Sequence, residues 1–286
     1  MVTRRVVSWA GLLAPSLLAS AVAAQVSTLS PSALVSVSID DLELKNFYIP
    51  GVLLPDGRFK YTLEFTDVSG VVVYINQTVD ALSDPQAKIT GQTKYTNTSG
   101  VPRSVKSQLS FQACPVLPGG TLFGGSVTVL VVTDANGGGV TCAPGSTSVW
   151  QATINDTVQH ILFACPFQMT KTGSGSLQTS TQFGTPVPSK PGPDDASSFG
   201  MNHNLTVTSG EAVTLTTTLV VKSLGLPSGC NADLSFDGMV DGIDLSAVLG
   251  NWNQGGWCVE GDVNLNGVVD GDDLGEVLAA WGTCGG

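Results

Sequence analysis

The sequence predicts a mainly β protein in which a β-sandwich domain over residues 25–223 is followed by a small all-α module over residues 230–286. Two observations support this fold class. The first domain alternates apolar and polar residues in short runs separated by Gly, Pro, Asn and Asp, which is typical of half-buried strands. The second contains one acidic twelve-residue segment twice, and an apolar pattern with helical spacing follows each copy.

Residues 1–24 are predicted to be a secretory signal peptide. Arg4 and Arg5 precede an apolar run over residues 6–23, and small residues lead up to a cleavage site after Ala24. No later segment is apolar for long enough to span a bilayer. We therefore expect a secreted protein, located outside the cell or at its surface.

The chain of 286 residues carries a net charge of −11, and this charge is concentrated near its C-terminus. Residues 230–286 contain ten acids and no Lys or Arg. Because such a surface repels phosphates, we expect neither a nucleic-acid partner nor an anionic membrane. An acidic segment of this kind favours a cation instead.

The predicted strands of the first domain share β-branched and aromatic residues with period-two alternation. They cover residues 35–39, 59–65, 71–79, 105–114, 127–132, 149–154, 205–207 and 213–221. No stretch before residue 224 keeps a 3.6-residue apolar period with good helix formers. Residues 224–229, which include the sequence Leu-Pro-Ser-Gly, are predicted to be a linker.

Catalytic motifs are missing from the first domain. It contains no G-x-S-x-G, H-E-x-x-H or phosphate-binding glycine loop, and its only histidines are His160 and His203. We assign no catalytic residue and expect a non-catalytic body. Two alternatives stay open: Glu64 with Asp67 as a glycosidase-type carboxylate pair, or a sugar-stacking platform. The candidates for that platform are Tyr48, Tyr61, Tyr74, Tyr95 and Trp150.

Six cysteines divide equally between the two parts of the chain. Cys114, Cys142 and Cys165 lie in the first, and Cys230, Cys258 and Cys284 lie in the second. Export favours disulfides, and three cysteines per part leave an odd one in each. Either a bridge joins the parts, or one cysteine in each is free or pairs with another chain. The similar sequences at 111–115 and 163–166 favour pairing Cys114 with Cys165, and Cys230 with Cys284 can close the tail.

The repeated acidic segments, residues 233–244 and 262–273, are predicted to bind two Ca²⁺ ions. A twelve-residue calcium loop supplies oxygens from positions 1, 3, 5, 7, 9 and 12, with Gly at position 6. The ligands in the first loop would be Asp233, Ser235, Asp237, the Met239 carbonyl, Asp241 and Asp244, and in the second Asp262, Asn264, Asn266, the Val268 carbonyl, Asp270 and Asp273. Hard oxygen ligands without His or Cys favour calcium, and a flexible seven-fold loop suits calcium better than the small octahedral magnesium ion.

Each loop is expected to begin a short amphipathic helix. The apolar positions spaced i, i+3, i+4 and i+7 are Leu245, Val248, Leu249 and Trp252 after the first loop, and Leu274, Val277, Leu278 and Trp281 after the second. Neither helix can bury its apolar stripe alone, so we expect the two to pack together across an approximate two-fold axis. Val240 and Val269 would then touch where the loops pair.

The pattern D-x-[SN]-x-[DN]-G-x-V-D-x-x-D-L, present twice, resembles the type I dockerin modules, whose calcium loops end in Asp where a standard EF-hand has Glu. The match covers about residues 230–281. The resemblance implies attachment, because dockerins bind cohesin modules on scaffold proteins and usually accompany polysaccharide-degrading enzymes or carbohydrate-binding modules. It predicts a cohesin-type or other extracellular protein partner. As alternatives, the β-sandwich is itself a polysaccharide-degrading enzyme or carbohydrate-binding module, or calcium only rigidifies the tail.

Overall fold

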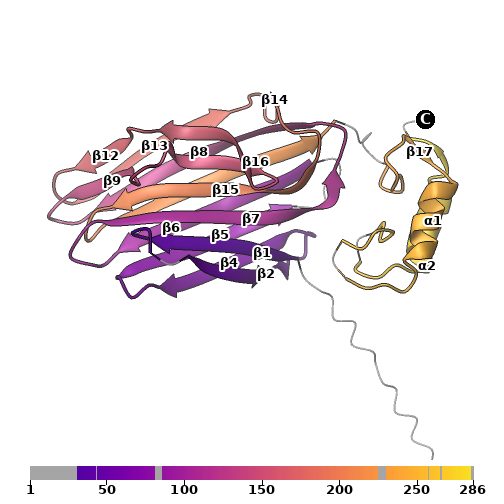
Figure 1. The fold of residues 1–286 in the computed structure, drawn as a ribbon, viewed down its shortest axis with the longest axis horizontal. Helices are drawn as coiled ribbons and strands as arrows, with labels where there is room; N and C mark the ends of the chain where they lie inside the picture. Colours follow the sequence, from indigo (N-terminus) through magenta and orange to yellow (C-terminus); the bar gives the residue numbers. More distant parts are fainter. Residues whose placement is uncertain are drawn as a thin grey trace, which may run out of the picture.

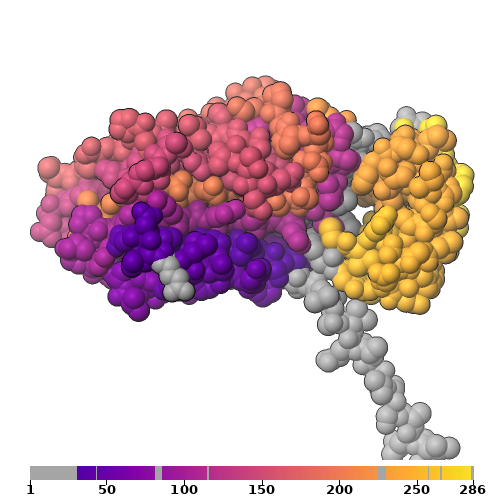
Figure 2. Space-filling view, viewed as in Figure 1, coloured from indigo at the N-terminus to yellow at the C-terminus, as the bar shows by residue number. Residues whose placement is uncertain are grey.

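The computed structural model describes residues 31–42, 44–80, 86–224, 230–256, 258–264 and 266–284. The predicted signal peptide and residues 225–229 of the predicted linker lie outside these ranges. Two antiparallel sheets face each other as a β-sandwich, and the tail lies beyond one end of it (Figure 1). The space-filling view shows the tail as a separate lobe beside that end (Figure 2). No described helix is long and apolar enough to cross a membrane.

The first sheet has the strand order β11-β10-β15-β7-β1-β2, and β9 pairs with both β15 and β12. Its strands are β1 (Ser32–Ile39), β2 (Lys45–Pro50), β7 (Arg103–Leu117), β9 (Gly138–Cys142), β10 (Ser148–Ile154), β11 (Thr157–Ala164), β12 (Gln168–Lys171) and β15 (Ala196–Val207).

The second sheet has the order β13-β8-β16-β6-β5-β4-β3, and β14 pairs with β8. Its strands are β3 (Val52–Leu53), β4 (Phe59–Thr66), β5 (Val71–Asp80), β6 (Gln86–Asn97), β8 (Thr121–Thr133), β13 (Gly175–Phe183), β14 (Lys190–Pro191) and β16 (Ala212–Ser223).

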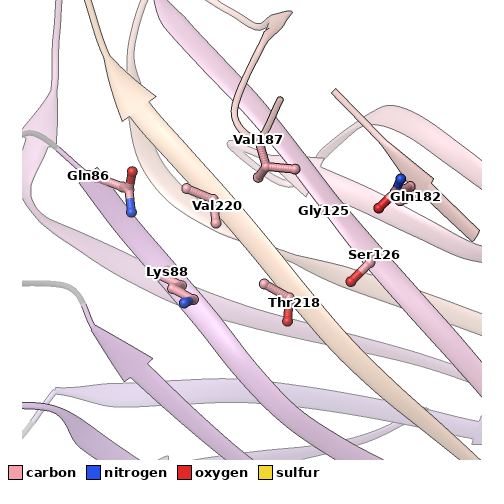
Figure 3. Close-up of a pocket in the computed structure, with 8 residues that line it drawn as sticks. All are labelled: Gln86, Lys88, Gly125, Ser126, Gln182, Val187, Thr218 and Val220. Carbon is pink, nitrogen blue, oxygen red and sulfur yellow. The ribbon is translucent and has the colours of Figure 1, made fainter. Parts of the chain in front are cut away.

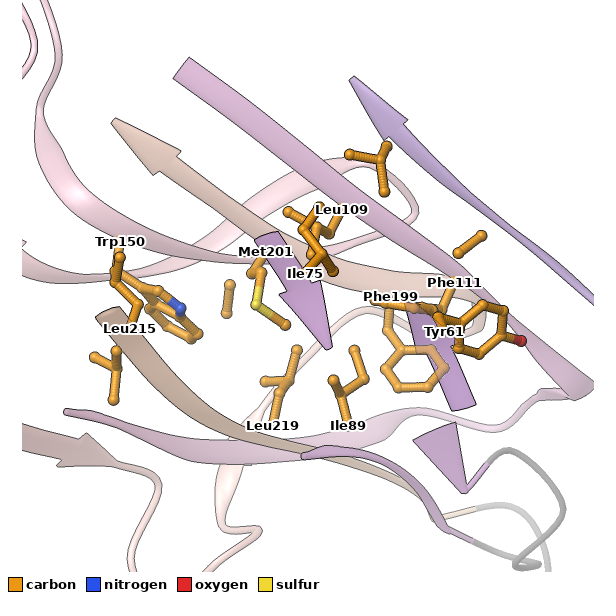
Figure 4. Close-up of a cluster of buried hydrophobic side chains, with 14 of the residues drawn as sticks. Tyr61, Ile75, Ile89, Leu109, Phe111, Trp150, Phe199, Met201, Leu215 and Leu219 are labelled. Carbon is orange, nitrogen blue, oxygen red and sulfur yellow. The ribbon is translucent and has the colours of Figure 1, made fainter. Parts of the chain in front are cut away.

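Alternation along the strands builds one core between the sheets. In β5, Val71, Val73 and Ile75 are buried, while the residues between them are partly exposed. The inward side chains of the two sheets meet in the cluster shown in Figure 4, which includes Trp150 and Met201 from the first sheet. Burial of this apolar surface, at roughly 25 cal/mol per Å², is the main stabilising contribution to the sandwich.

All eight predicted strands are confirmed, and several of the strands that were not predicted are short or rich in polar residues. In β6 the inner face includes Thr93, which is buried against Gln77 of β5 and accepts a hydrogen bond from its Nε2 at 3.3 Å. β13 is an edge strand, pairing with β8 alone, and is rich in Ser, Thr and Gln. Polar edges of this kind discourage pairing with another chain, which explains the missing signal.

A polar cluster lies inside the core between the sheets. The Tyr95 hydroxyl is 2.8 Å from His203 Nδ1 and 2.5 Å from the Ser107 hydroxyl, and all three residues are buried. Burial lowers the pKa of His203 to about 3 and raises the pKa of Tyr95. The imidazole is therefore neutral in the folded protein at neutral pH.

The tail is not all-α as expected. It has two helices of nine residues, α1 (Gly242–Gly250) and α2 (Gly271–Ala279), and a small sheet of β17 (Met239–Val240) with β18 (Gly282–Thr283). Loops make up most of the rest. Its own small core is built largely from valines, namely Val240, Val248, Val263, Val269 and Val277.

Only part of each predicted apolar stripe is buried. Val248 and Val277 are fully buried, whereas Leu249 and Leu278 are each 54% exposed. Trp252 and Trp281 follow the ends of their helices and are also exposed. A helix of about two turns packs only one line of side chains against this small core. The remaining apolar side chains of the predicted stripe therefore face solvent.

The two loops do not pair with each other as expected, although Val240 and Val269 share the tail core. Each loop instead pairs with the segment that follows the other helix. Val240 lies opposite Gly282 after α2, and the Val269 amide donates to the Gln254 carbonyl after α1 at 3.0 Å. This crosswise pairing arises because the two repeats are antiparallel neighbours, so the chain leaving one helix passes the other loop.

All six cysteines form disulfides: Cys114 with Cys258, Cys142 with Cys165, and Cys230 with Cys284. The predicted closure of the tail by Cys230 and Cys284 is confirmed, as is the alternative of a bridge between the two parts. The pairing of Cys114 with Cys165 is wrong, because Cys165 is bonded to Cys142. The Cys142 amide donates to the Phe167 carbonyl at 3.3 Å, which holds the segment after Cys165 beside β9. Three disulfides are typical of an oxidising compartment.

Candidate metal centre

The first acidic loop folds around the carboxylate of Asp233, at position 1. Asp233 is buried, and its two oxygens accept hydrogen bonds from the amides of Asp237 at 3.2 Å and Gly238 at 2.8 Å. The backbone reverses at Gly238, whose φ of +88° is strained for other residues. Position 6 therefore needs glycine, as the calcium-loop pattern predicts.

The loop closes on Asp244, at position 12. Its Oδ1 accepts from the Ser235 amide and its Oδ2 from the Asp241 amide, both at 2.8 Å. Asp241 is also the N-cap of α1, and its side chain accepts from the Ile243 amide at 2.7 Å. Asp241 and Asp244 thus form a capping box that joins the loop rigidly to its helix.

The second loop repeats this network at every corresponding residue. Asp262 accepts from the amides of Asn266 at 3.0 Å and Gly267 at 2.8 Å. Asp273 accepts from the amides of Asn264 at 3.1 Å and Asp270 at 2.8 Å, and φ is +91° at Gly267. Two copies with the same hydrogen bonds have the same internal geometry, so the repeat in sequence is a repeat in structure.

Negative charge is concentrated inside the loops of the tail. Four carboxylates are buried, those of Asp233, Asp244, Asp262 and Asp273. The hydrogen bonds just described come from backbone amides, and residues 230–286 contain no Lys or Arg to balance the charge. Buried carboxylates are stable when paired or coordinated to metal, so this donor set suits a hard cation.

The predicted ligand side chains are not drawn together into one tight group. Among the described residues, the acid, thiol and imidazole side chains that meet within 4.8 Å are Cys230, Asp233 and Cys284. The two cysteines are bonded to each other, which leaves no thiolate to bind a metal. At position 5, Asp237 is exposed and accepts from the Met239 amide at 2.9 Å. The aspartates at positions 1 and 12 are buried in both loops.

Glu64 and Asp67, the carboxylate pair considered for the body, have different surroundings. Glu64 is exposed on β4, whereas Asp67 is buried and paired with Lys45. The hydrogen bond from Lys45 lowers the pKa of Asp67 to about 2, so that this group stays ionised at neutral pH. A glycosidase acid needs a raised pKa, which Asp67 does not have.

The five aromatic candidates for a sugar platform do not lie on one exposed face. Trp150, Tyr95 and Tyr61 are buried in the sandwich core, and Tyr48 is 75% exposed on β2. Tyr74, on β5, is partly exposed. Alternation decides this outcome, because neighbouring positions on a strand face opposite sides of a sheet.

The second sheet carries a shallow polar groove that was not predicted. It has a volume of about 330 Å³ and runs across β6, β16, β8 and β13 (Figure 3). The groove is lined by Gln86, Lys88, Gly125, Ser126, Gln182, Val187, Thr218 and Val220. Most of its residues come from strands that are distant in sequence. The sequence gives no signal for such a groove, because outward polar residues also occur on an ordinary solvated face of a sheet.

Fold and candidate site together define a disulfide-bonded β-sandwich protein with a tail of two acidic loop–helix repeats. No known family model and no curated protein matches the chain. Among solved structures it is similar to the adhesin domain of Epf from Streptococcus pyogenes, at 12% identity over 66% of this chain and 57% of that one, with a TM-score of 0.26. The chain thus spans less than two thirds of that domain.

Two other solved structures are similar to this chain. One is infectious bursal disease virus, Gx strain, at 13% identity over 74% of this chain and 53% of that chain, with a TM-score of 0.24. The other is the C-terminal CBM6 of LamC, a laminarinase from Zobellia galactanivorans, at 11% identity over 57% of this chain and 99% of that chain, with a TM-score of 0.19. At these TM-scores the likeness supports no inference about ligand or activity.

Proposed function

We propose that this chain is a secreted attachment protein whose dockerin-like tail binds two Ca²⁺ ions and whose β-sandwich is a non-catalytic body. One observation carries the proposal: both loops place two buried aspartates in the same network of backbone amides. Residues 230–286 contain no Lys or Arg to balance this charge. Calcium would relieve the repulsion and hold each loop on its helix.

The partner in this proposal is a cohesin-type module or another extracellular protein. Exposed apolar side chains on the tail support a protein partner, because Leu249 and Trp252 recur 29 residues later as Leu278 and Trp281. Exposed Trp residues are typical of interaction surfaces. Calcium acts indirectly in this scheme, since it fixes the helices that present these side chains.

Removing the closing aspartates should abolish calcium binding by the tail. In the full chain, the double variant Asp244→Asn, Asp273→Asn should bind two fewer Ca²⁺ ions by isothermal titration calorimetry. Each loop loses its inward charge at position 12, and the thermal midpoint of the tail should no longer rise with calcium. Asp272→Asn is the matched control, because Asp272 is exposed beside Asp273 and should bind as the wild type does. If the double variant binds as many Ca²⁺ ions as the wild type, the proposal is contradicted.

The protein partner can be tested separately. Trp252→Ala with Trp281→Ala should retain both ions but lose calcium-dependent capture of a purified cohesin panel or of secreted proteins from the same source. Calcium binding with no calcium-dependent partner would favour a tail that is only rigidified.

A second candidate function, polysaccharide binding by the body, is favoured by the groove across β6, β16, β8 and β13. Its side chains offer amide, hydroxyl and ammonium groups, which suit the hydroxyls of a sugar chain. Gln182→Ala with Lys88→Ala should then weaken retention on a polysaccharide column about tenfold or more, at about 1.4 kcal/mol per tenfold. Glu64→Gln, outside the groove, serves as the control. If the wild-type protein binds no polysaccharide of a broad panel, this function is excluded.

A further inference from the structure

A second acidic site lies at the end of the sandwich away from the tail. Asp134 directly follows β8 and Glu211 directly precedes β16, which neighbours β8 in the sheet. The tail leaves from the other end of these strands, where the Leu224 amide donates to the Gly120 carbonyl at 2.9 Å. The thirteen residues of β8 separate the two ends by about 40 Å. This site is therefore independent of the tail loops.

Glu211 is fully buried, with 0% of the residue exposed. Its Oε1 accepts a hydrogen bond from the Asp134 amide at 3.4 Å, and its Oε2 has no hydrogen-bond partner among the described residues. Burial, together with the charge of Asp134, raises the pKa of Glu211. Leaving a buried carboxylate oxygen unpaired is unfavourable, so a bound group is expected to compensate.

The carboxylate of Asp134 lies close to Gly210, the residue that precedes Glu211. Its Oδ1 accepts from the Asn136 amide at 2.7 Å, and its Oδ2 accepts from Asn136 Nδ2 at 3.2 Å. Two glycines leave room for the acids, since a Cβ at Gly210 would lie 2.6 Å from Asp134 Oδ2 and one at Gly138 would lie 2.8 Å from Glu211 Oε1. Within the described ranges, the four ion pairs all involve other acids.

We propose that Asp134 and Glu211 bind a calcium ion in the body. Two carboxylates neutralise one divalent cation, and the hydroxyl of Thr208 lies near Glu211 as a further oxygen, since both would meet a Cβ at Gly138. Hard oxygen donors without nitrogen or sulfur select calcium or magnesium, and a site on irregular loops suits the flexible coordination of calcium better. With two charged ligands the affinity should be that of extracellular modules, at Kd of about 10⁻⁴–10⁻³ M.

The test uses the full chain with its tail loops disabled by Asp244→Asn and Asp273→Asn. Equilibrium dialysis against radioactive calcium should find one ion bound per chain, with a Kd of about 10⁻⁴–10⁻³ M. Adding Glu211→Gln or Asp134→Asn should weaken this binding about tenfold or more, since one of two charged ligands is lost. Calcium at ten times the Kd should raise the thermal midpoint of the body by about 3 °C, and Glu211→Gln should remove the rise.

Glu64→Gln is the control, because it removes an exposed carboxylate of the same body. If the chain with disabled tail loops does not fold, Glu211→Gln is made in the wild-type chain instead. The expected result there is the loss of one bound Ca²⁺ ion. The proposal is overturned if the Glu211→Gln variant binds as many Ca²⁺ ions as the chain without this substitution. It is also overturned if calcium leaves the thermal midpoint of the body unchanged, which would mean that Glu211 holds only a proton or a water. Failure of the tail loops to bind calcium would leave this result unaffected.

Discussion

Acidification from pH 7 to pH 4 should destabilise the sandwich by about 3 kcal/mol through His203 alone. Burial lowers the pKa of this imidazole from 6.5 to about 3 in the folded protein, whereas the unfolded chain takes up the proton at the ordinary value. The unfolded state therefore binds more protons between these two pKa values. The contribution of His203 to the free energy of unfolding is fully present above pH 6.5 and is lost as the pH falls toward 3.

Urea unfolding at a series of pH values checks this prediction. His203→Gln, whose amide oxygen can still accept from the Tyr95 hydroxyl, should lose the dependence between pH 6.5 and 4 that belongs to the histidine. His160→Gln is a matched control, because His160 is the only other histidine and is only partly buried, beside Lys190. A parallel loss in both variants, or an unchanged slope in His203→Gln, would contradict the assignment.

Removing the Cys114–Cys258 disulfide should have the second large effect, a loss of about 2–5 kcal/mol. The bond joins β7 of the sandwich to the tail across 144 residues, and it limits the unfolded chain more than the other two bonds do. It also fastens the tail to the body between the two loops. The variant Cys114→Ser, Cys258→Ser should therefore unfold in two calorimetric steps, the tail first, where the wild type unfolds in one.

Cys142→Ser with Cys165→Ser is the control for this experiment. That bond closes only 23 residues within the body, so its loss should cost less and leave the tail coupled. A single transition in the Cys114→Ser, Cys258→Ser variant would show that noncovalent contacts are enough to hold the tail.

Local patterns allowed much of this fold to be predicted. The run at residues 71–79 predicted β5 because every second valine or isoleucine is buried against the opposite sheet. The glycines at position 6 and the aspartates at positions 1, 9 and 12 predicted both loops, since each of these roles depends on residues within one twelve-residue segment. Such short-range chemistry can be read directly from sequence.

Other features depend on partners that are far apart in the chain. The polar run of β6 becomes a central strand only because β5 and β16 flank it. Cys114 bonds to Cys258 because β7 ends where the tail lies, which no spacing between cysteines indicates. Trp150 and Tyr95 were candidates for a sugar platform as well as for the core, and the sheet register placed both inside.

The sequence by itself determined the alternating strands, the two acidic loops and the helix that begins at each. Only the tertiary structure decided which half of each helical stripe is buried, how the loops pair crosswise, and that Glu211 meets Asp134 at one end of the sandwich. The physical reason is the distance along the chain over which each interaction acts. Caps, turns and alternation act over a few residues, whereas disulfide partners, sheet neighbours and buried acid pairs are set by how distant segments pack.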